Sequence, residues 1–169
     1  KDWQKLVHGR EHFFAHPQSQ MVLLALDLDG YIQLPKHSDA WIAQRLSLSE
    51  EDVANSLRIL DNSGQIRWTG THWNFGDSLT IDMQSHPEAV RHLKAWWGDA
   101  SLQAYRRGVD GVYSYNLCTV SEADFEKLQE LQRATYRAMR TIIAESKAGD
   151  RLVLAHLAVQ ALSGNKSHA

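Results

Sequence analysis

The stretch from Ser38 to Asp77 constrains the fold of this chain more than any other part of the sequence. It reads SDAWIAQRLSLSEEDVANSLRILDNSGQIRWTGTHWNFGD. Its residues predict two short helices, a glycine turn and a pair of strands in that order. In the first predicted helix, three apolar residues recur at helical spacing: Trp41, Ile42 and Leu46.

The second predicted helix of this stretch covers Glu50–Asn62. Ser49 precedes it and can cap it, because a serine hydroxyl accepts hydrogen bonds from the free N–H groups of a first turn. Its first turn is acidic, which the positive end of the helix dipole favours; the acids are Glu50, Glu51 and Asp52. Its buried face is predicted to carry Val53, Leu57 and Leu60, and its exposed face Asp52, Asn55, Ser56, Arg58 and Asp61.

A β-hairpin is predicted to follow this helix. Gly64 suits a left-handed helix end, and the two strands, Gln65–Thr69 and His72–Phe75, flank a turn at Gly70-Thr71. Trp68 and Trp73 are expected to pack the hairpin onto the rest of the protein. Two helices followed by a hairpin are typical of a winged-helix-like module.

The N-terminal region is predicted to begin with a helix over Lys1–His16. Within it His8, His12 and His16 are four residues apart and share one face, which is a spacing that can hold a metal ion. The simpler interpretation is a solvated histidine face, and no cofactor is expected. The apolar run Met21–Leu28 favours a short helix that ends in a turn at Asp29-Gly30. A third strand is predicted at Ser78–Met83.

The C-terminal half predicts two helices and at least one strand. Pro87 suits the first turn of an amphipathic helix over Glu88–Arg107 that Gly98 could divide. The β-branched and aromatic residues of Val112–Val120 favour a strand, in which Cys118 is expected to be buried. A long helix runs from Glu122 to about Lys147, capped by Ser121 with Asp124 and ended by Gly149. Arg151–Leu162 is either a strand or a last helix.

The expected fold class is therefore α+β. The winged-helix-like module, with the N-terminal helix, occupies residues 1–83. It is joined to a helical, strand–helix–strand part over residues 84–169, in which a long helix can connect two parallel strands.

Composition narrows the classes of function. Across 169 residues the formal net charge is −2, so the chain lacks the general basic excess that phosphate contacts favour in nucleic-acid binders. A single cysteine excludes a disulfide within the chain and a zinc site made mainly of cysteines. No apolar run reaches the ~18 residues of a membrane span, and no signal peptide pattern is present. We expect a cytoplasmic protein that does not enter a membrane.

The central functional question is whether the module reads DNA. The side chains best suited to contact DNA are Asn55, Arg58, Arg67 and His72. In winged-helix and helix-turn-helix proteins the leading end of the recognition helix reads the bases. Here that end carries three acids, which would face phosphates of the same sign. We therefore expect the module to serve packing, dimerisation or signal relay rather than DNA reading.

Two segments of the chain resemble a known family. WIAQRLSLSEEDVANSLRILDNSGQI and YNLCTVSEADFEKLQELQRATYRAMRTIIAESKAGDRLVLAHLAVQAL are similar to bacterial transcriptional regulators that carry an N-terminal helix-turn-helix domain followed by a C-terminal domain of unknown function. The similarity lies in that C-terminal domain and spans about Trp3 to Leu162. It implies that the DNA-reading domain is absent from this chain, and it supplies no ligand residues.

The expected function is thus that of an effector-sensing or oligomerisation domain of a transcriptional regulator. Its expected partners are a second copy of the chain, a small-molecule or protein effector, and DNA through the absent domain. The alternatives are a winged-helix protein that binds DNA by itself, an uncharacterised enzyme and a small-molecule sensor. Catalysis is not expected, because the sequence shows no nucleophile motif and no phosphate-binding loop.

Overall fold

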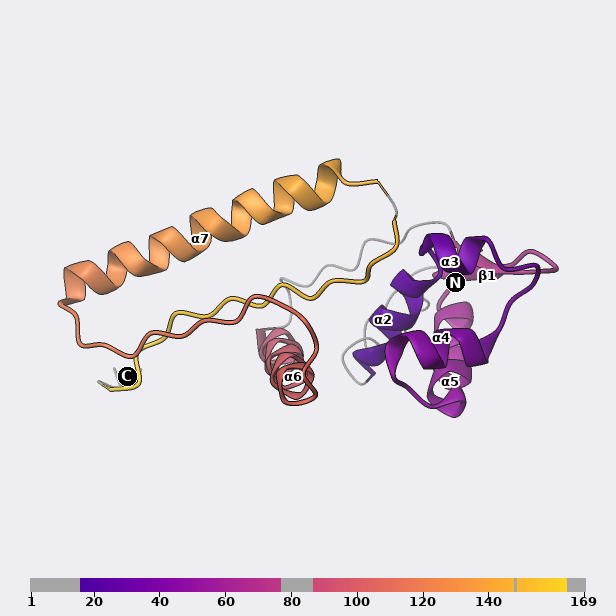
Figure 1. Ribbon diagram of the computed structural model, residues 1–169, viewed down its shortest axis with the longest axis horizontal. Coiled ribbons are helices and arrows are strands. Elements are labelled where there is room, and N and C mark those ends of the chain that lie inside the picture. The colour runs from indigo at the N-terminus through magenta and orange to yellow at the C-terminus, as the bar shows by residue number, and fades with distance from the viewer. Residues whose placement is uncertain (1–15, 77–86, 148, 164–169) are drawn as a thin grey trace. The chain divides into compact units, whose positions relative to one another are not determined.

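The computed structural model describes residues 16–76, 87–147 and 149–163 (Figure 1). These residues form two compact units. The first unit contains residues 16–76, 87–100 and 149–153, and the second contains residues 101–147 and 154–163. The boundary predicted between residues 83 and 84, the helix over residues 1–15 and the strand Ser78–Met83 lie outside the described residues.

Four helices build the first half of the first unit: α2 (Gln18–Ala25), α3 (Asp29–Ile32), α4 (Asp39–Leu46) and α5 (Glu50–Asn62). The helices predicted around Met21, Trp41 and Glu50 are confirmed. The turn predicted at Asp29-Gly30 is wrong, because these residues begin the short helix α3, with Asp29 in its first turn.

Serine hydroxyls begin both helices of the central stretch. The backbone N–H of Trp41 donates to Ser38 Oγ over 3.1 Å at the start of α4. At the start of α5, the N–H of Asp52 donates to Ser49 Oγ over 3.0 Å, as its sequence predicts. Each hydroxyl thereby satisfies one of the N–H groups that a helix N-terminus leaves unpaired.

Replacement of Ser49 by alanine is expected to destabilise the first unit by about 0.5–2 kcal/mol, because the Asp52 N–H loses its acceptor. Urea denaturation followed by tryptophan fluorescence measures the change. Ser49→Thr keeps a hydroxyl and serves as the matched control. Equal unfolding midpoints for Ser49→Ala and the wild type would show that the cap contributes nothing.

The hairpin consists of β1 (Ile66–Trp68) and β2 (Trp73–Phe75), paired antiparallel with Arg67 opposite Asn74. Gly64, with φ of 75°, lies in the left-handed region after α5, as predicted, and lets the chain turn into β1. The hairpin is confirmed, with strands shorter than the sequence suggests. Trp68 and Trp73 pack edge to face, with ring centroids 5.2 Å apart.

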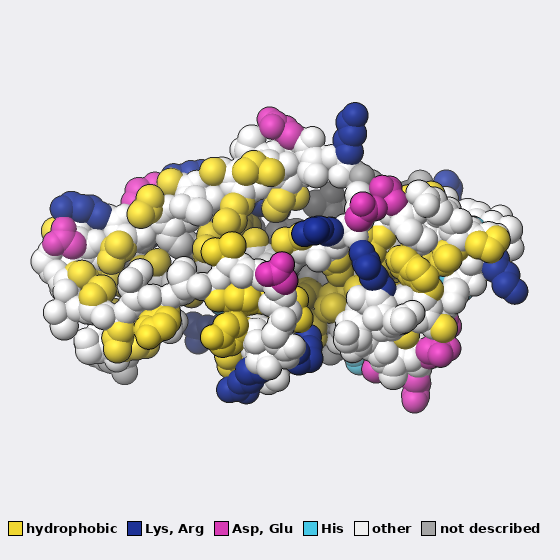
Figure 2. All heavy atoms as spheres, viewed as in Figure 1, with side chains coloured by type: hydrophobic (Ala, Val, Ile, Leu, Met, Phe, Trp, Pro, Cys, Tyr) yellow, Lys and Arg dark blue, Asp and Glu magenta, His cyan; other side chains and the backbone are white. Residues whose placement is uncertain are grey.

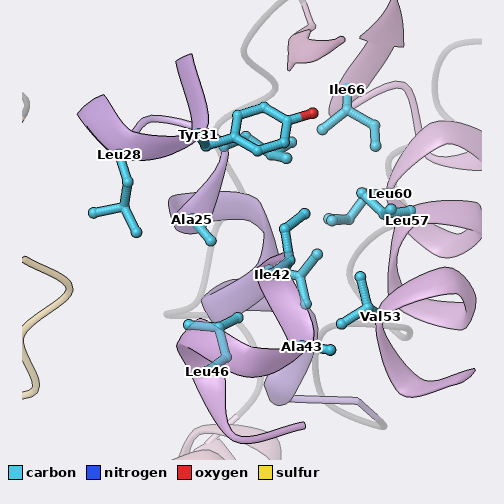
Figure 3. Close-up of a cluster of buried hydrophobic side chains, with 12 residues drawn as sticks. Ala25, Leu28, Tyr31, Ile42, Ala43, Leu46, Val53, Leu57, Leu60 and Ile66 are labelled. Carbon is cyan, nitrogen blue, oxygen red and sulfur yellow. The ribbon is translucent and has the colours of Figure 1, made fainter. Parts of the chain in front are cut away.

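The core of the first unit lies between α2, α4, α5 and the hairpin (Figure 3). The predicted apolar face of α5 is confirmed, since Val53, Leu57 and Leu60 are buried. Ile42 of α4 and Ile66 of β1 close the same cluster. One detail of the predicted exposed face is wrong: Ser56 is buried, because it is three residues after Val53 and four before Leu60 and so shares their buried face.

The segment 149–153 returns to the first unit after the long helix. The N–H of Asp29 donates to the carbonyl of Gly149 over 3.4 Å, and Arg45 Nη2 donates to the carbonyl of Asp150 over 2.5 Å. Leu152 packs against the hydrophobic core. The first unit is therefore built from stretches of chain that are distant in sequence.

Two longer helices follow the hairpin: α6 (Pro87–Arg106) and α7 (Glu122–Glu145). Gly98 does not divide α6, which continues through it. Ser121 caps α7 as predicted: it accepts from the Asp124 N–H over 3.2 Å, and its hydroxyl donates to the Asp124 carboxylate over 2.7 Å. The predicted end at Gly149 is wrong, because Ser146 already has extended backbone.

The strand–helix–strand prediction for the C-terminal part is wrong. Residues 109–121 and 151–161 form neither strand nor helix, and Figure 1 shows both as drawn-out chain. The hairpin is the only sheet within the described ranges. Cys118 is exposed rather than buried, because no paired strand or second layer covers it. High β-propensity favours extended backbone, but a strand also requires a partner.

The described residues are thus mostly helical with one small antiparallel hairpin, consistent with the α+β class. Among the helices that the structure describes, none combines the length and the hydropathy needed to cross a membrane.

Candidate nucleic-acid interface and the Tyr31 cluster

The predicted DNA contacts on α5 are coupled to each other. Arg58 Nη2 donates to Asn55 Oδ1 over 2.6 Å. Arg58 is exposed and Asn55 is half-buried. The guanidinium thus uses one of its donors on a neighbour of its own helix, and the Asn55 amide oxygen is occupied.

The other two predicted contacts lie on the hairpin and differ from one another. Arg67 projects from β1 and is exposed. His72 is half-buried; its Nδ1 lies 3.2 Å from Thr71 Oγ1, and its Nε2 is buried with no hydrogen-bond partner among the described residues. The His72 imidazole therefore faces the protein interior. Of the two candidate contacts on the hairpin, Arg67 is the one whose charged side chain is exposed to solvent.

The electrostatics at the leading end of α5 are negative. Glu50, Glu51 and Asp52 are all exposed there. Ser49 Oγ donates to one oxygen of the Asp52 carboxylate over 2.6 Å, which holds that charge at the helix terminus. These carboxylates stabilise the helix through its dipole. They would repel a phosphate brought to the same turn.

A hydrogen-bonded cluster lies between α3 and the hairpin, centred on Tyr31. Its hydroxyl accepts from the Trp73 backbone N–H over 3.1 Å and lies 2.9 Å from His37 Nδ1. His37 Nε2 lies 2.6 Å from Asp39 Oδ1. Since a carboxylate only accepts, Nε2 carries a proton, and Nδ1 of a neutral His37 accepts a hydrogen bond from the Tyr31 hydroxyl.

Aromatic rings enclose the same cluster. The centroids of the His37, Trp41 and His72 rings lie 5.8, 6.0 and 5.4 Å from that of Tyr31. The Trp68 ring meets His37 edge-on at 5.9 Å. In Figure 3 the Tyr31 hydroxyl points toward the side on which Ile66 lies. The cluster thereby ties α3 and the link before α4 to both strands.

The cluster has the residue types of an acid–base relay but not the access that catalysis needs. Tyr31 is 1% exposed, so a substrate cannot reach its oxygen. Burial raises the pKa of the Tyr31 phenol above its usual value, which favours the neutral form further. The backbone N–H of His37 also donates to the Thr71 carbonyl over 2.8 Å. This arrangement fastens the hairpin to α3.

The metal site suggested by the spacing of His8, His12 and His16 lies mostly outside the described residues. His8 and His12 lie outside the described residues, and His16 is the first residue described. Within residues 16–76, 87–147 and 149–163, no group of three or more His, Cys, Asp or Glu side chains is placed to hold a metal ion.

Sequence reasoning missed Tyr31, His37 and Asp39 as a group. Tyr31 contacts His37 six residues away and Trp73 forty-two residues away. Such spacings belong to no local motif. The sequence offered one hint of this group: Tyr31 directly follows Asp29-Gly30, and His37 directly precedes Ser38.

Comparison with known proteins places the chain in one family. No curated protein and no solved structure matches it. Residues 1–162 match the family described as "Domain of unknown function (DUF4423)". This match spans nearly the whole sequence, and the chain therefore belongs to the DUF4423 family.

Proposed function

We propose that this chain is the regulatory part of a bacterial transcriptional regulator, acting in the cytoplasm by effector sensing or oligomerisation. The DNA-reading helix-turn-helix domain of that regulator lies outside this chain. Two observations support the proposal: the resemblance of the two quoted segments to such regulators, and the order of α4, α5 and a hairpin, which is that of a winged helix.

The observation that carries the proposal is the charge of α5. In a winged helix, α5 would be the recognition helix, and base contacts come from its leading end. That end presents Glu50, Glu51 and Asp52 to solvent. Of the four candidate contacts, Arg58 and Asn55 bind each other and His72 faces inward. A scaffold that reports to another domain fits this surface better than a reader of DNA.

An electrophoretic gel shift tests the proposal. The chain, mixed with a pool of duplex DNA at about 50 and about 200 mM salt, is expected to give no shift at either concentration. Binding through phosphate contacts would be strong at the lower salt and fall steeply at the higher, because it releases counterions.

Charge variants make the outcome specific. A salt-sensitive shift that is lost in Arg58→Ala or Arg67→Ala, and kept in the matched variant Arg106→Ala on α6, would contradict the proposal. It would establish instead that the module binds DNA by itself.

A further inference from the structure

Two aspartates of this chain are followed directly by glycine, in the pairs Asp29-Gly30 and Asp110-Gly111. An aspartate side chain is short enough to reach the backbone N–H groups beside it. A glycine in the next position has no Cβ to hinder that approach and leaves the backbone a wide choice of angles. In such a pair the aspartate carboxyl group can react with the following amide, provided that the backbone between them can rotate.

The backbone of Asp110-Gly111 is held by no hydrogen bond of its own. Both residues are exposed, in a segment that is neither helix nor strand. Within the described part of the chain, neither their backbone groups nor the Asp110 carboxylate has a hydrogen-bonding or ionic partner. The nearest bonds fall on Val109, whose N–H donates to the Ala104 carbonyl over 3.1 Å and whose carbonyl accepts from the Tyr113 hydroxyl over 3.1 Å. The peptide between Asp110 and Gly111 therefore keeps its rotational freedom.

The other pair is held in a helix. Asp29 begins α3, and its N–H donates to the Gly149 carbonyl over 3.4 Å while its carbonyl accepts from the Gln33 N–H over 3.0 Å. Gly30 lies against the Trp41 ring, so closely that a Cβ on Gly30 would come within 2.9 Å of it. Rotation of the Asp29-Gly30 peptide therefore requires α3 to open locally and to lose these contacts.

Solvent reaches the Asp110-Gly111 segment freely. Val112, the next residue, is fully exposed, and Tyr115 is 91% exposed. Figure 2 shows hydrophobic side chains of the second unit lying open on the visible face. Water thus has access to the peptide bond between Asp110 and Gly111.

We propose that Asp110 is a site of spontaneous covalent modification, at which aspartate converts to isoaspartate through a succinimide formed with the Gly111 amide. In the first step the Gly111 nitrogen bonds to Asp110 Cγ, and the carboxyl hydroxyl leaves as water together with the amide proton. In the second step water adds to a ring carbonyl. Opening at the side-chain carbonyl restores aspartate, whereas opening at the backbone carbonyl gives isoaspartate. The two steps need no oxidant, reductant or cofactor, and the inference is independent of the proposed function.

The product differs from the original chain in its backbone rather than in its charge. In isoaspartate the main chain passes through Cβ and is one methylene longer, and a carboxylate remains on Cα. The change falls in the connection between α6 and residues 112–120. An isoaspartyl carboxylate is a methyl acceptor for carboxyl methyltransferases that use S-adenosylmethionine, which is the class of enzyme that would recognise this site.

Incubation of the full chain at neutral pH and physiological temperature tests the proposal. Tryptic peptides are taken at intervals, and isoaspartate is located by chromatography with electron-transfer fragmentation. Methyl transfer from labelled S-adenosylmethionine by an isoaspartyl carboxyl methyltransferase confirms the product. We expect isoaspartate to accumulate at Asp110 about tenfold faster or more than at Asp29, because α3 must open before Asp29 can react. In guanidinium chloride, where the same dipeptide is unfolded at both positions, the two rates should converge.

Two variants make the outcome specific. Asp110→Glu should abolish the product at this position, because the longer side chain has to close a larger and less favourable ring. Gly111→Ala should slow the reaction, because its Cβ hinders attack on Asp110 Cγ. The φ of Gly111 lies outside the left-handed region, and the added Cβ meets only the half-exposed Tyr113 ring, at 3.0 Å, so this variant keeps the backbone.

Three results would overturn the proposal. The first is an equal rate at Asp29 and Asp110 in the folded chain. The second is the absence of isoaspartate from Asp110 when the denatured chain forms it. The third is a Gly111→Ala variant that reacts as fast as the wild type, since the Gly111 amide would then not be the attacking group.

Discussion

Leu60→Ala is expected to destabilise the first unit by about 2–5 kcal/mol. Leu60 is fully buried in α5 and packs in the cluster that α2, α4 and the hairpin share. The truncation removes apolar surface from the core and leaves a cavity that the surrounding side chains fill only in part. Urea denaturation monitored by tryptophan fluorescence reports the change, since Trp41, Trp68 and Trp73 belong to this unit.

The matched control is Leu24→Ala, which makes the same truncation on α2 at a side chain that is half exposed. Its effect should be markedly smaller than that of Leu60→Ala. Similar losses at the two positions would mean that α5 is not packed against α2 and α4 as described.

Tyr31→Phe is expected to cost about 1–3 kcal/mol, because two half-buried residues lose a hydrogen-bond partner. The ring and its aromatic contacts remain, but the Trp73 N–H and His37 Nδ1 both lose the hydroxyl. Tyr115→Phe, at a side chain that is 91% exposed, is the control and should change stability by less than about 0.5 kcal/mol.

The same variant should alter the pH dependence of stability. Burial raises the pKa of the Tyr31 phenol in the folded state, so the unfolded chain loses this proton first, near pH ~10. The contribution of the neutral phenol is full below that pH and is lost as the pH rises through the folded-state pKa. Melting temperatures between pH 8 and 11 should fall more steeply for the wild type than for Tyr31→Phe; parallel curves would contradict the assignment.

The parts of the fold that could be predicted from sequence are those set by neighbouring residues. Ser49 and Ser121 cap α5 and α7, where the hydroxyl and the N–H that it accepts are three residues apart. Gly64 ends α5 because its backbone turns left-handed there. The spacing of Val53, Leu57 and Leu60 fixed which face of α5 is buried.

The errors fall where structure depends on distant or missing partners. Residues 112–120 have the composition of a strand, but no other segment that the structure describes forms a ladder with them, so Cys118 is exposed. The Tyr31 cluster needs the fold to bring α3 to the hairpin before its hydrogen bonds can form. The sequence indicates which residue types could contact DNA. It does not predict the hydrogen bond between Arg58 and Asn55 or the inward position of His72, because both depend on side-chain geometry.

The return of residues 149–153 to the first unit determines how this protein can be divided. A fragment that stops at residue 100 would lack Leu152 on its core and the carbonyls that Arg45 and Asp29 bind. The chain passes between the two units three times, near residues 100, 147 and 153. A single proteolytic cut near residue 100 or 147 therefore separates residues 149–153 from the rest of the first unit in the sequence. A cut near residue 153 leaves the first unit joined to residues 101–147 of the second. Because the described parts of the first unit lie on both sides of residues 101–147 in the sequence, no single truncation isolates that unit.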